Sequence, residues 1–539
     1  MRIGLFHGYE LTGSGSNEYT RYLARALAEQ GHEVHVLCRE PKPEAAGVDA
    51  AIAWDASGAP TPLFGTPGGV GTVTLHRLPH ADIRPVYVTD KQREGNVKAY
   101  PDLTDEELHE VREVAHGAVR GVLRAYPVDV LHANHLVLQP TIAADVCESL
   151  GIPYVIYPHG SDIEYTIRND ERYLVLAGEA LATSAGLITG SSEMVQRVSA
   201  LYPQQREWIE ANHEVVGVGV DVDLFTRVPV AERSASIAAL VATGPGGGKT
   251  ADQVAQFHRQ LDAGDLSTIR ETAAAYAREL PDDGAAAALT GIPWQEGKVL
   301  LFVGALTGGK GLQSVIAALP AVLTQVPATH LVIVGSGTFR EVLEAMVHAI
   351  ATGNEALLDE LVRHGNDFED TPTSGAWPDV ATYLADAENR RKVLTAGPGF
   401  AGHVHFIGRM GHDRLQHLFP CADLAVFPSI VPEAYPLVLM ESLASGVLPC
   451  ASDTTGLGEG LTLLEPHLGS EVVQRLRLPM DDSVRVAAIA ERLTSLLTDP
   501  DLADLGGQLR QIAVTEYDWP VRAAQMVAAY ERFAGSGRV

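Results

Sequence analysis

The sequence contains few cysteines and no long hydrophobic run. Four cysteines occur in 539 residues, at positions 38, 147, 421 and 450, and no two of them are close. This spacing suggests neither a disulfide framework nor a zinc site, and it favours a reducing compartment. No stretch approaches the roughly 18 apolar residues of a membrane-spanning helix. The apolar run at residues 1–8 is too short for a signal peptide. We therefore expect a soluble, cytoplasmic protein.

Positive charge is also scarce. The chain has 40 Lys and Arg against 68 Asp and Glu, a net charge of −28, which disfavours nucleic acid and anionic lipid as general partners. Only seven of the 40 basic residues are lysines, so a lysine in a glycine-rich loop is notable. The 46% hydrophobic content is typical of a globular protein, and the length predicts two or more domains.

Hydrophobic strand-like segments alternate with helical segments along the chain. In the first forty residues, strands at 3–6 and 33–38 flank a glycine-rich loop and a helix whose apolar face lies between residues 19 and 27. Further strands are predicted at 128–132, 154–157 and 186–190. A second set is predicted at 299–304, 330–335, 404–408, 424–428 and 447–451. This α/β alternation predicts two doubly wound parallel sheets.

The two sets predict two Rossmann-like domains facing a central cleft, with helical insertions. The expected ranges are 1–225 for the first domain, 226–297 for a helical insertion or linker, and 298–510 for the second domain, which contains another insertion at about 342–400. In such sheets, ligands bind at the carboxyl ends of the strands.

Glu433 and Glu441 are the most informative pair of acidic residues. Glu433 follows the strand at 424–428, and Glu441 lies in a helix that ends at Gly446, a good residue to follow a helix. Pro436 suits the first turn of that helix. The free amides of a helix start favour phosphate, and carboxylates accept hydrogen bonds from hydroxyls, so the pair suits a nucleotide sugar. Alternatively, Glu441 offsets the helix dipole and Glu433 is a solvated loop charge.

Three further residues follow predicted strands. Lys310, in the loop 304–311, would place its ammonium on a phosphate held at a helix start, or else is simply exposed. His159 would hydrogen-bond a sugar hydroxyl, or else is a structural histidine. Arg409 would contact a phosphate or a base, or else is a surface arginine.

Other motifs are incomplete. The Gly13-Ser-Gly15 sequence lacks the third glycine of a dinucleotide site, because that position is Glu18. The segment 243–250, which contains Lys249, resembles a P-loop but begins with Thr243, so a mobile glycine-rich linker is the better interpretation. Neither a metal-ligand spacing nor a Gly-x-Ser-x-Gly elbow is present in the sequence.

Taken together, these motifs resemble family 4 of the retaining glycosyltransferases, which have the two-domain GT-B fold. The order and spacing of the landmarks carry the resemblance, which covers both sheets and not the insertions. The landmarks are Gly15-Ser-Asn-Glu18, Asp129-Val-Leu-His132, His159-Gly160, 219–225, 304–311, 334–337, 404–408, 422–429, the Glu433/Glu441 pair, 455–459 and 517–519.

The resemblance implies roles for individual residues. Lys310 would hold the donor diphosphate and Glu441 the ribose hydroxyls, while Glu433 would lie beside the donor sugar and the reacting centre. His159 would touch that sugar from the opposite domain. The remaining implied donor-binding residues are Gly15, Ser16, Arg409, Ala434, Tyr435, Pro436 and Leu437. The resemblance also implies that residues 511–539 form a helix that packs back on the first domain.

The sequence departs from the family pattern at three places. Ala305 stands where the family often has arginine, so one phosphate contact is lost unless an arginine such as Arg409 replaces it. Ser16 stands where the family has a second loop glycine. Tyr435-Pro436 stands where the family has Phe-Gly, and Pro436 removes one amide donor.

The expected function is the transfer of a sugar from a nucleotide-diphosphate sugar to an acceptor hydroxyl, with retention at the anomeric carbon. The resemblance implies front-face substitution without a required metal or other cofactor. The alternatives are a sugar phosphorylase or epimerase with the same fold, a nucleotide-sugar-binding protein with a degenerate site, and an ATP-binding protein using Lys249. The acceptor is expected to be soluble. The sequence does not specify the base, the sugar, the acceptor, the oligomeric state or the roles of the insertions.

Overall fold

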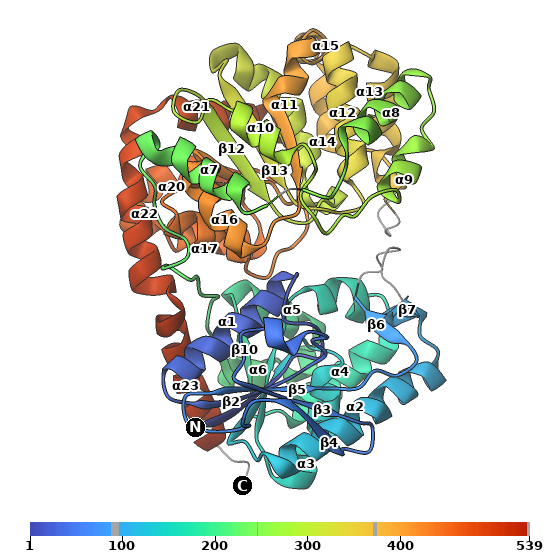
Figure 1. Ribbon diagram of the computed structural model, residues 1–539, viewed down its shortest axis with the longest axis vertical. Coiled ribbons are helices and arrows are strands. Elements are labelled where there is room, and N and C mark those ends of the chain that lie inside the picture. The colour runs from blue at the N-terminus through green and yellow to red at the C-terminus, as the bar shows by residue number, and fades with distance from the viewer. Residues whose placement is uncertain (88–95, 245, 370–374, 536–539) are drawn as a thin grey trace. The chain divides into compact units, whose positions relative to one another are not determined.

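A computed structural model describes residues 1–87, 96–244, 246–369 and 375–535 (Figure 1). The chain divides into two compact units. Unit 1 comprises Met1–Val220, Ala434–Leu437 and Thr515–Val539, and unit 2 comprises Asp221–Glu433 and Val438–Val514. The fold class is α/β, as the sequence predicts, with a mainly parallel sheet in each unit.

In the described part of unit 1, nine strands form one sheet in the order β11-β10-β9-β8-β1-β2-β5-β3-β4. All neighbours are parallel except β3 and β4. A short parallel pair, β6 and β7, stands apart. The bounds are β1 (Arg2–Phe6), β2 (Glu33–Cys38), β3 (Ala50–Trp54), β4 (Pro60–Phe64), β5 (Val73–Arg77), β6 (Arg84–Val86), β7 (Val97–Ala99), β8 (Val130–Asn134), β9 (Tyr154–Tyr157), β10 (Gly186–Thr189) and β11 (His213–Val215).

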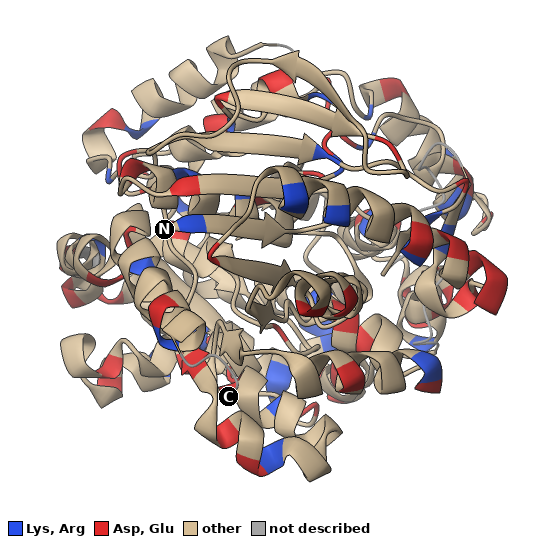
Figure 2. Cartoon of the chain, turned by 90° about the horizontal axis from the view of Figure 1, so that it is seen from below, with Lys and Arg blue, Asp and Glu red and all other residues tan. Residues whose placement is uncertain are grey.

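Helices cover this sheet because its central strands are buried on both faces, as a parallel sheet requires. Helix α1 begins where the Ser14 side chain accepts a hydrogen bond from the Asn17 amide, and α2 begins with a capping box of Thr104 and Glu107. Figure 2 shows that charged residues lie mostly on helices and loops rather than on the strands. The helices are α1 (Gly15–Glu29), α2 (Asp105–Ala125), α3 (Gln139–Leu150), α4 (Glu171–Thr183), α5 (Ser192–Leu201), α6 (Arg206–Ala211) and α23 (Trp519–Gly535).

The C-terminal helix α23 packs within unit 1. The rings of Tyr22 on α1 and Trp519 stack with centroids 6.0 Å apart. Tyr530 and His132 share a buried hydrogen bond of 2.7 Å between Oη and Nδ1. The last helix of the chain is thereby bound to β8 and α1, which lie hundreds of residues earlier.

The sheet of unit 2 is fully parallel over its described residues, in the order β14-β13-β12-β15-β16-β17. Its strands are β12 (Lys298–Val303), β13 (Thr329–Val334), β14 (Val404–Gly408), β15 (Leu424–Phe427), β16 (Leu448–Ser452) and β17 (Arg477–Leu478). The helices before β14 are α7 (Arg233–Ala242), α8 (Ala251–Asp262), α9 (Thr268–Ala273), α10 (Ala285–Gly291), α11 (Leu312–Gln325), α12 (Arg340–Thr352), α13 (Glu355–His364), α14 (Pro378–Ala385) and α15 (Ala387–Leu394). Those after it are α16 (His412–Leu418), α17 (Leu437–Ala444), α18 (Thr455–Thr462), α19 (Glu465–Leu468), α20 (Ser470–Leu476), α21 (Arg485–Thr498) and α22 (Gly506–Ile512).

A buried ionic network joins the segment before β12 to helix α12. The Lys249 ammonium is fully buried and ion-paired with Glu344 and, at 3.3 Å, with Glu341. Arg340 binds the Asp282 carboxylate (2.9 Å from Nη1 to Oδ1) and Glu344 (2.8 Å). The Lys249 ammonium is therefore enclosed by protein carboxylates rather than placed to meet a phosphate.

The glycine-rich segment around Lys249 is packed rather than a free linker over its described residues 246–250. The amides of Gly247 and Gly248 donate to the Pro281 carbonyl at 2.9 and 2.8 Å. The prediction of a mobile linker is wrong here, because these backbone contacts and the buried Lys249 pairs were not visible in the local sequence.

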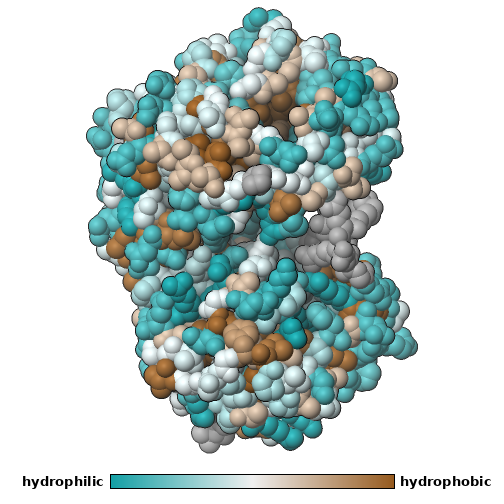
Figure 3. All heavy atoms as spheres, viewed as in Figure 1, coloured by the Kyte–Doolittle hydropathy of each residue, from teal (hydrophilic) through white to brown (hydrophobic). Residues whose placement is uncertain are grey.

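No helix among the described residues is long and apolar enough to cross a membrane. In the view of Figure 3, hydrophobic residues reach the surface only in small groups among hydrophilic ones. Scattered groups of this kind are normal on a folded protein.

We predict that Lys249→Met destabilises unit 2 by about 3–5 kcal/mol, because it leaves buried carboxylates without their cation. Urea unfolding of the full chain, followed by circular dichroism, measures this change. Lys392→Met is the matched control, because Lys392 pairs with Glu388 at the protein surface, and its expected effect is within about 0.5 kcal/mol. Equal unfolding midpoints for the two variants would contradict the role assigned to the network.

Candidate active site

Two glycines let the loops after β12 and β13 pack closely against neighbouring backbone. Gly311 has φ +72°, and a Cβ there would lie 2.0 Å from the Pro428 carbonyl oxygen. Gly335 has φ +152°, and a Cβ there would lie 1.8 Å from the Gly304 carbonyl oxygen. Only glycine fits these positions. As a result, the loop 304–311 lies directly against the segment that follows β15.

Lys310 and Glu433, which the sequence predicts as site residues, meet in unit 2. The Lys310 ammonium forms an ion pair with Glu433 Oε1, and Ser429 Oγ donates to the same oxygen at 2.7 Å. The Glu433 amide donates to Thr455 Oγ1 at 2.9 Å. Both charged side chains remain partly exposed, at 26% for Lys310 and 17% for Glu433. The pair is therefore held in place and still open to a ligand.

Arg485 contacts the segment that follows β15, and the sequence analysis did not predict it. Its guanidinium is fully buried and donates to the Pro428 carbonyl and, at 3.1 Å, to Ser452 Oγ. A Cβ on Gly311 would lie 3.4 Å from Arg485 Nη2. Its Nε lies 3.6 Å from Asp379 Oδ2, so a guanidinium whose charge is partly offset is held beside the start of α11. No local signal could reveal it, because Arg485 lies more than fifty residues beyond the segment it contacts.

Glu441, the second glutamate, is 3% exposed on α17. Its Oε1 lies 3.2 Å from His412 Nε2. The His412 ring packs edge-on against Phe225, with centroids 5.6 Å apart. His412 was not among the predicted residues. It belongs to the first turn of α16, so the fold brings the loop after β14 and helix α17 together.

Arg409 lies beside an acidic residue of the preceding segment. It forms an ion pair with Glu279, whose side chain is mostly exposed. Nearby, Pro281 bridges to Gly408, and the Asp282 amide donates to the Ile407 carbonyl at 2.9 Å. The segment 279–282 therefore runs along the end of β14. Ala305 is exposed, and the replacement of its missing arginine by Arg409 stays a prediction.

In unit 1, His159 follows β9 and is half-buried. Its Nε2 lies 2.6 Å from Asn134 Oδ1, and its ring centroid lies 4.7 Å from that of His135. Burial, helped by the nearby His7 and His132, holds the pKa of His159 well below its usual value. The His159 imidazole is therefore neutral at physiological pH, and it can exchange hydrogen bonds with hydroxyls without carrying charge.

The other predicted residues fall at two places. Gly15 and Ser16 form the first turn of α1, where Ser16 Oγ lies 3.2 Å from Ser14 Oγ. Ala434, Tyr435, Pro436 and Leu437 group with unit 1, and Tyr435 is buried while the other three are partly exposed. Pro436 directly precedes α17. The predicted approach of His159 to Glu433 stays a prediction, because these residues belong to different units.

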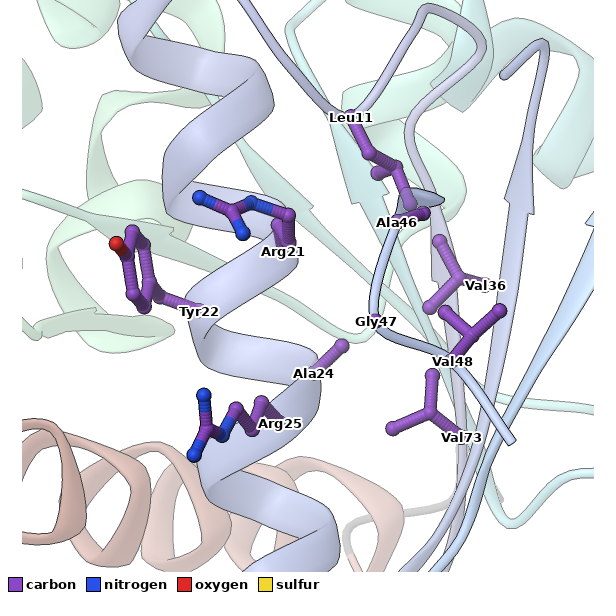
Figure 4. Close-up of a pocket in the computed structure, with 10 residues that line it drawn as sticks. All are labelled: Leu11, Arg21, Tyr22, Ala24, Arg25, Val36, Ala46, Gly47, Val48 and Val73. Atoms are coloured by element: carbon purple, nitrogen blue, oxygen red, sulfur yellow. The ribbon is translucent and has the colours of Figure 1, made fainter. Parts of the chain in front are cut away.

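A small hollow lies beside α1 in unit 1 (Figure 4). Its volume is about 50 Å³, and Arg21, Tyr22 and Arg25 on α1 border it opposite Gly47. This volume admits one or two water molecules and is far below that of a ligand pocket. Within the described ranges, no group of three or more His, Cys, Asp or Glu residues is placed to hold a metal ion.

Two family models match the chain. One, described as "Glycosyl transferase 4-like domain", matches residues 14–210 in unit 1. The other, "Glycosyl transferases group 1", matches residues 385–508 in unit 2. The chain belongs to the family 4-like glycosyltransferases with the GT-B fold.

Individual proteins are also similar to this chain. Phosphatidyl-myo-inositol mannosyltransferase of Mycobacterium tuberculosis is 27% identical over 162 residues, which are 30% of this chain and 41% of that protein. The match thus spans about two fifths of the relative's length. Sucrose-phosphate synthase from Thermosynechococcus elongatus has a similar structure, with a TM-score of 0.55, 18% identity, and coverage of 99% of this chain and 100% of that one. Anabaena HepE, solved with UDP and glucose, has a TM-score of 0.53, 14% identity and 98% coverage of both chains.

We predict that Gly311→Ala destabilises unit 2 by at least about 2 kcal/mol, because it adds left-handed strain and a backbone clash. The control is Gly399→Ala, where an added Cβ meets no atom within 4 Å and we expect a change within about 0.5 kcal/mol. Urea unfolding measures both variants. A Gly311→Ala protein as stable as the control would show that the close approach to Pro428 is not required.

Proposed function

We propose that this protein transfers a sugar from a nucleotide-diphosphate sugar to an acceptor hydroxyl, with retention of the anomeric configuration. The ion pair of Lys310 with Glu433, at the carboxyl ends of β12 and β15, carries the proposal. Ligands of parallel α/β sheets bind at that edge. The named activity of the mycobacterial relative and the UDP and glucose bound to HepE support a nucleotide-sugar donor.

Lys310 acts on the donor diphosphate in this proposal. When a diphosphate arrives, its charge competes with Glu433 for the Lys310 ammonium. The amides at the start of α11 add partial positive charge, and the buried Arg485 guanidinium lies beside the same turn. These groups stabilise negative charge that grows on the departing phosphate, which is the main electrostatic requirement of the reaction.

Glu433 acts on the transferred sugar. Released from Lys310, its carboxylate accepts hydrogen bonds from sugar hydroxyls, while Ser429 and Thr455 keep it in place. The bond from the anomeric carbon to the phosphate oxygen breaks, and a bond to the acceptor oxygen forms on the same face. The acceptor proton passes to the departing phosphate oxygen, so charge and atoms balance with no metal in the step.

The remaining roles concern the nucleotide and the sugar. Glu441, oriented by His412, accepts hydrogen bonds from the ribose hydroxyls. Neutral His159 hydrogen-bonds the donor sugar from unit 1 when the units close on the substrates. The ATP-binding alternative has little support, because the Lys249 ammonium is enclosed by Glu341 and Glu344.

We predict that Lys310→Gln lowers kcat/KM for transfer about 100-fold or more, because one donor of positive charge to the leaving phosphate is lost. Glu433→Gln should retain nucleotide binding and lose transfer to a similar extent. The assay incubates UDP-, GDP- and ADP-sugars with a panel of acceptors and identifies products by mass spectrometry, and proton NMR gives the anomeric configuration.

Lys298→Gln is the matched control for these variants. Lys298 begins β12 at the opposite end of the strand and pairs with Asp423 at 3.6 Å, so its loss should leave transfer unchanged. Full activity of both site variants, or an inverted product, would refute the proposed roles. Donor binding without any transfer would favour the degenerate binding protein, and release of sugar phosphate would favour a phosphorylase.

We also predict that His412→Gln raises the KM for the donor about tenfold or more with little change in kcat. A hydrogen bond to a charged group contributes about 1.5–3 kcal/mol, and Glu441 would lose the group that orients it. His417→Gln, on the same helix, is the control. A fall in kcat at constant KM would place His412 in the chemical step instead.

A further inference from the structure

A group of charged residues lies at the carboxyl edge of the unit 1 sheet, apart from His159. We call it the Arg39 cluster, and it consists of Arg39, Arg84, His80, Glu10 and Tyr9. Arg39 directly follows β2, Tyr9 and Glu10 follow β1, His80 follows β5, and Arg84 begins β6. The sheet therefore brings Arg39 and His80 to the edge where α/β folds bind ligands, and Arg84 reaches the same place from the separate strand β6 through its ion pair with Glu10.

Arg39 is a half-buried cation without a counter-ion in the described part of the chain. Its Nε is enclosed and makes no hydrogen bond to a described residue. Its backbone amide donates a hydrogen bond to the Tyr9 carbonyl, at 2.7 Å. Burial lowers the pKa of Arg39 against the opposing effect of Tyr100 and Tyr9, and the charge of Arg84 lowers it further. An enclosed guanidinium is costly unless an anion meets it.

The nearby carboxylates have other partners. Glu10 forms an ion pair with Arg84. The Glu40 carboxylate accepts hydrogen bonds from the backbone amides of Leu11 and Lys42, at 2.9 and 3.1 Å. At the exposed rim, partial burial and then the charges of Arg39 and Arg84 lower the pKa of His80 to about 4. Glu10 thus offsets the charge of Arg84 and His80 is neutral, which leaves Arg39 as the cation of this cluster that has no ion-pair partner among the described residues.

Unsatisfied polar atoms lie next to this cluster. His135 is 1% exposed, has φ +69°, and neither of its ring nitrogens has a hydrogen-bond partner among the described residues. Its ring lies 5.4 Å from that of Tyr9, whose hydroxyl shares a 2.9 Å hydrogen bond with Tyr100. Buried polar atoms of this kind usually meet a ligand or water. His135 and the two tyrosines therefore place groups beside the cluster that can hydrogen-bond ligand hydroxyls.

We propose that the Arg39 cluster binds a phosphate group carried by the hydroxylated acceptor, with Arg39 as the principal phosphate ligand. The planar guanidinium matches phosphate through two parallel hydrogen bonds, and Arg84, which is paired with Glu10, adds a second guanidinium nearby. His135 and the tyrosines beside it then face the acceptor hydroxyls. The identity of the ligand as an acceptor rests on the proposed function. The binding of phosphate to the Arg39 cluster can be tested without any transfer.

The first experiment measures phosphate binding alone. All variants carry Lys310→Gln, which removes the expected donor phosphate contact in unit 2. Inorganic phosphate is titrated at constant ionic strength against chloride, and thermal unfolding of the unit 1 transition is recorded. We expect phosphate to raise the Tm, and we expect Arg39→Gln to abolish at least nine tenths of that rise. Arg124→Gln is the control, because Arg124 is exposed at the end of α2.

Two results would overturn the phosphate site. One is the absence of any phosphate-dependent rise in Tm in the Lys310→Gln protein. The other is an equal rise with Arg39→Gln and with Arg124→Gln. Arg39→Gln should fold, because it removes an enclosed cation that lacks a counter-ion, and circular dichroism checks this.

The second experiment tests the acceptor role with the otherwise native protein. Transfer is compared between phosphorylated and neutral forms of the same polyols, and between phosphatidylinositol and phosphatidylcholine vesicles, which separates a soluble phosphate from a lipid headgroup. We expect Arg39→Gln to raise the KM for the phosphorylated acceptor at least tenfold relative to its neutral counterpart. An unchanged ratio would refute the inference even if transfer occurs. Absence of transfer with every donor would instead refute the proposed function, and the phosphate titration would still stand.

Discussion

The candidate site in unit 2 depends on one close approach between two backbone segments, Gly311 against the Pro428 carbonyl. This contact excludes any side chain at position 311. It brings the loop after β12 against the segment after β15, so that Lys310 meets Glu433. Arg485 closes the same arrangement by donating to the Pro428 carbonyl. The ion pair, the helix start and the buried guanidinium therefore meet at this one close contact, and the chemistry proposed for the donor phosphate uses all three.

The distribution of charge is as important as its total. Acidic residues outnumber basic ones by 68 to 40, yet Lys310, Arg485 and Arg39 all lie at carboxyl edges of the two sheets. The net negative charge disfavours polyanions as general partners, and positive side chains at these edges favour the binding of small phosphates there. Lys249 differs from these residues, because its ammonium is buried inside unit 2 in ion pairs with Glu341 and Glu344. Its role is to hold the segment before β12 on α12, and this segment in turn brings Glu279 to Arg409.

Unit 1 combines neutral and charged groups at its sheet edge. His159, His7 and His135 are kept neutral by burial, so they offer hydrogen bonds without electrostatic repulsion among themselves. Arg39 stands at the same edge as a cation. A substrate that bears both hydroxyls and a phosphate matches this division. The family relationship leaves such specificity open, because acceptor recognition lies in loops and insertions rather than in the fold.

The sequence by itself determined the two parallel sheets and the order of the loops that carry Lys310, His159 and Glu433. These features follow from local patterns, namely hydrophobic strands, glycine-rich turns and helix starts that lie within a few residues of one another. Strands β3 to β7, β11 and β17 escaped prediction, and so did His412, Arg485 and the Arg39 cluster. The positions of His412 and Arg485 depend on partners far away in the chain. The same holds for Lys249, whose glutamate partners lie 92 and 95 residues later. Only the tertiary structure decided which charged side chains form ion pairs inside the protein and which can still meet a ligand. This depends on long-range packing, which no local pattern encodes.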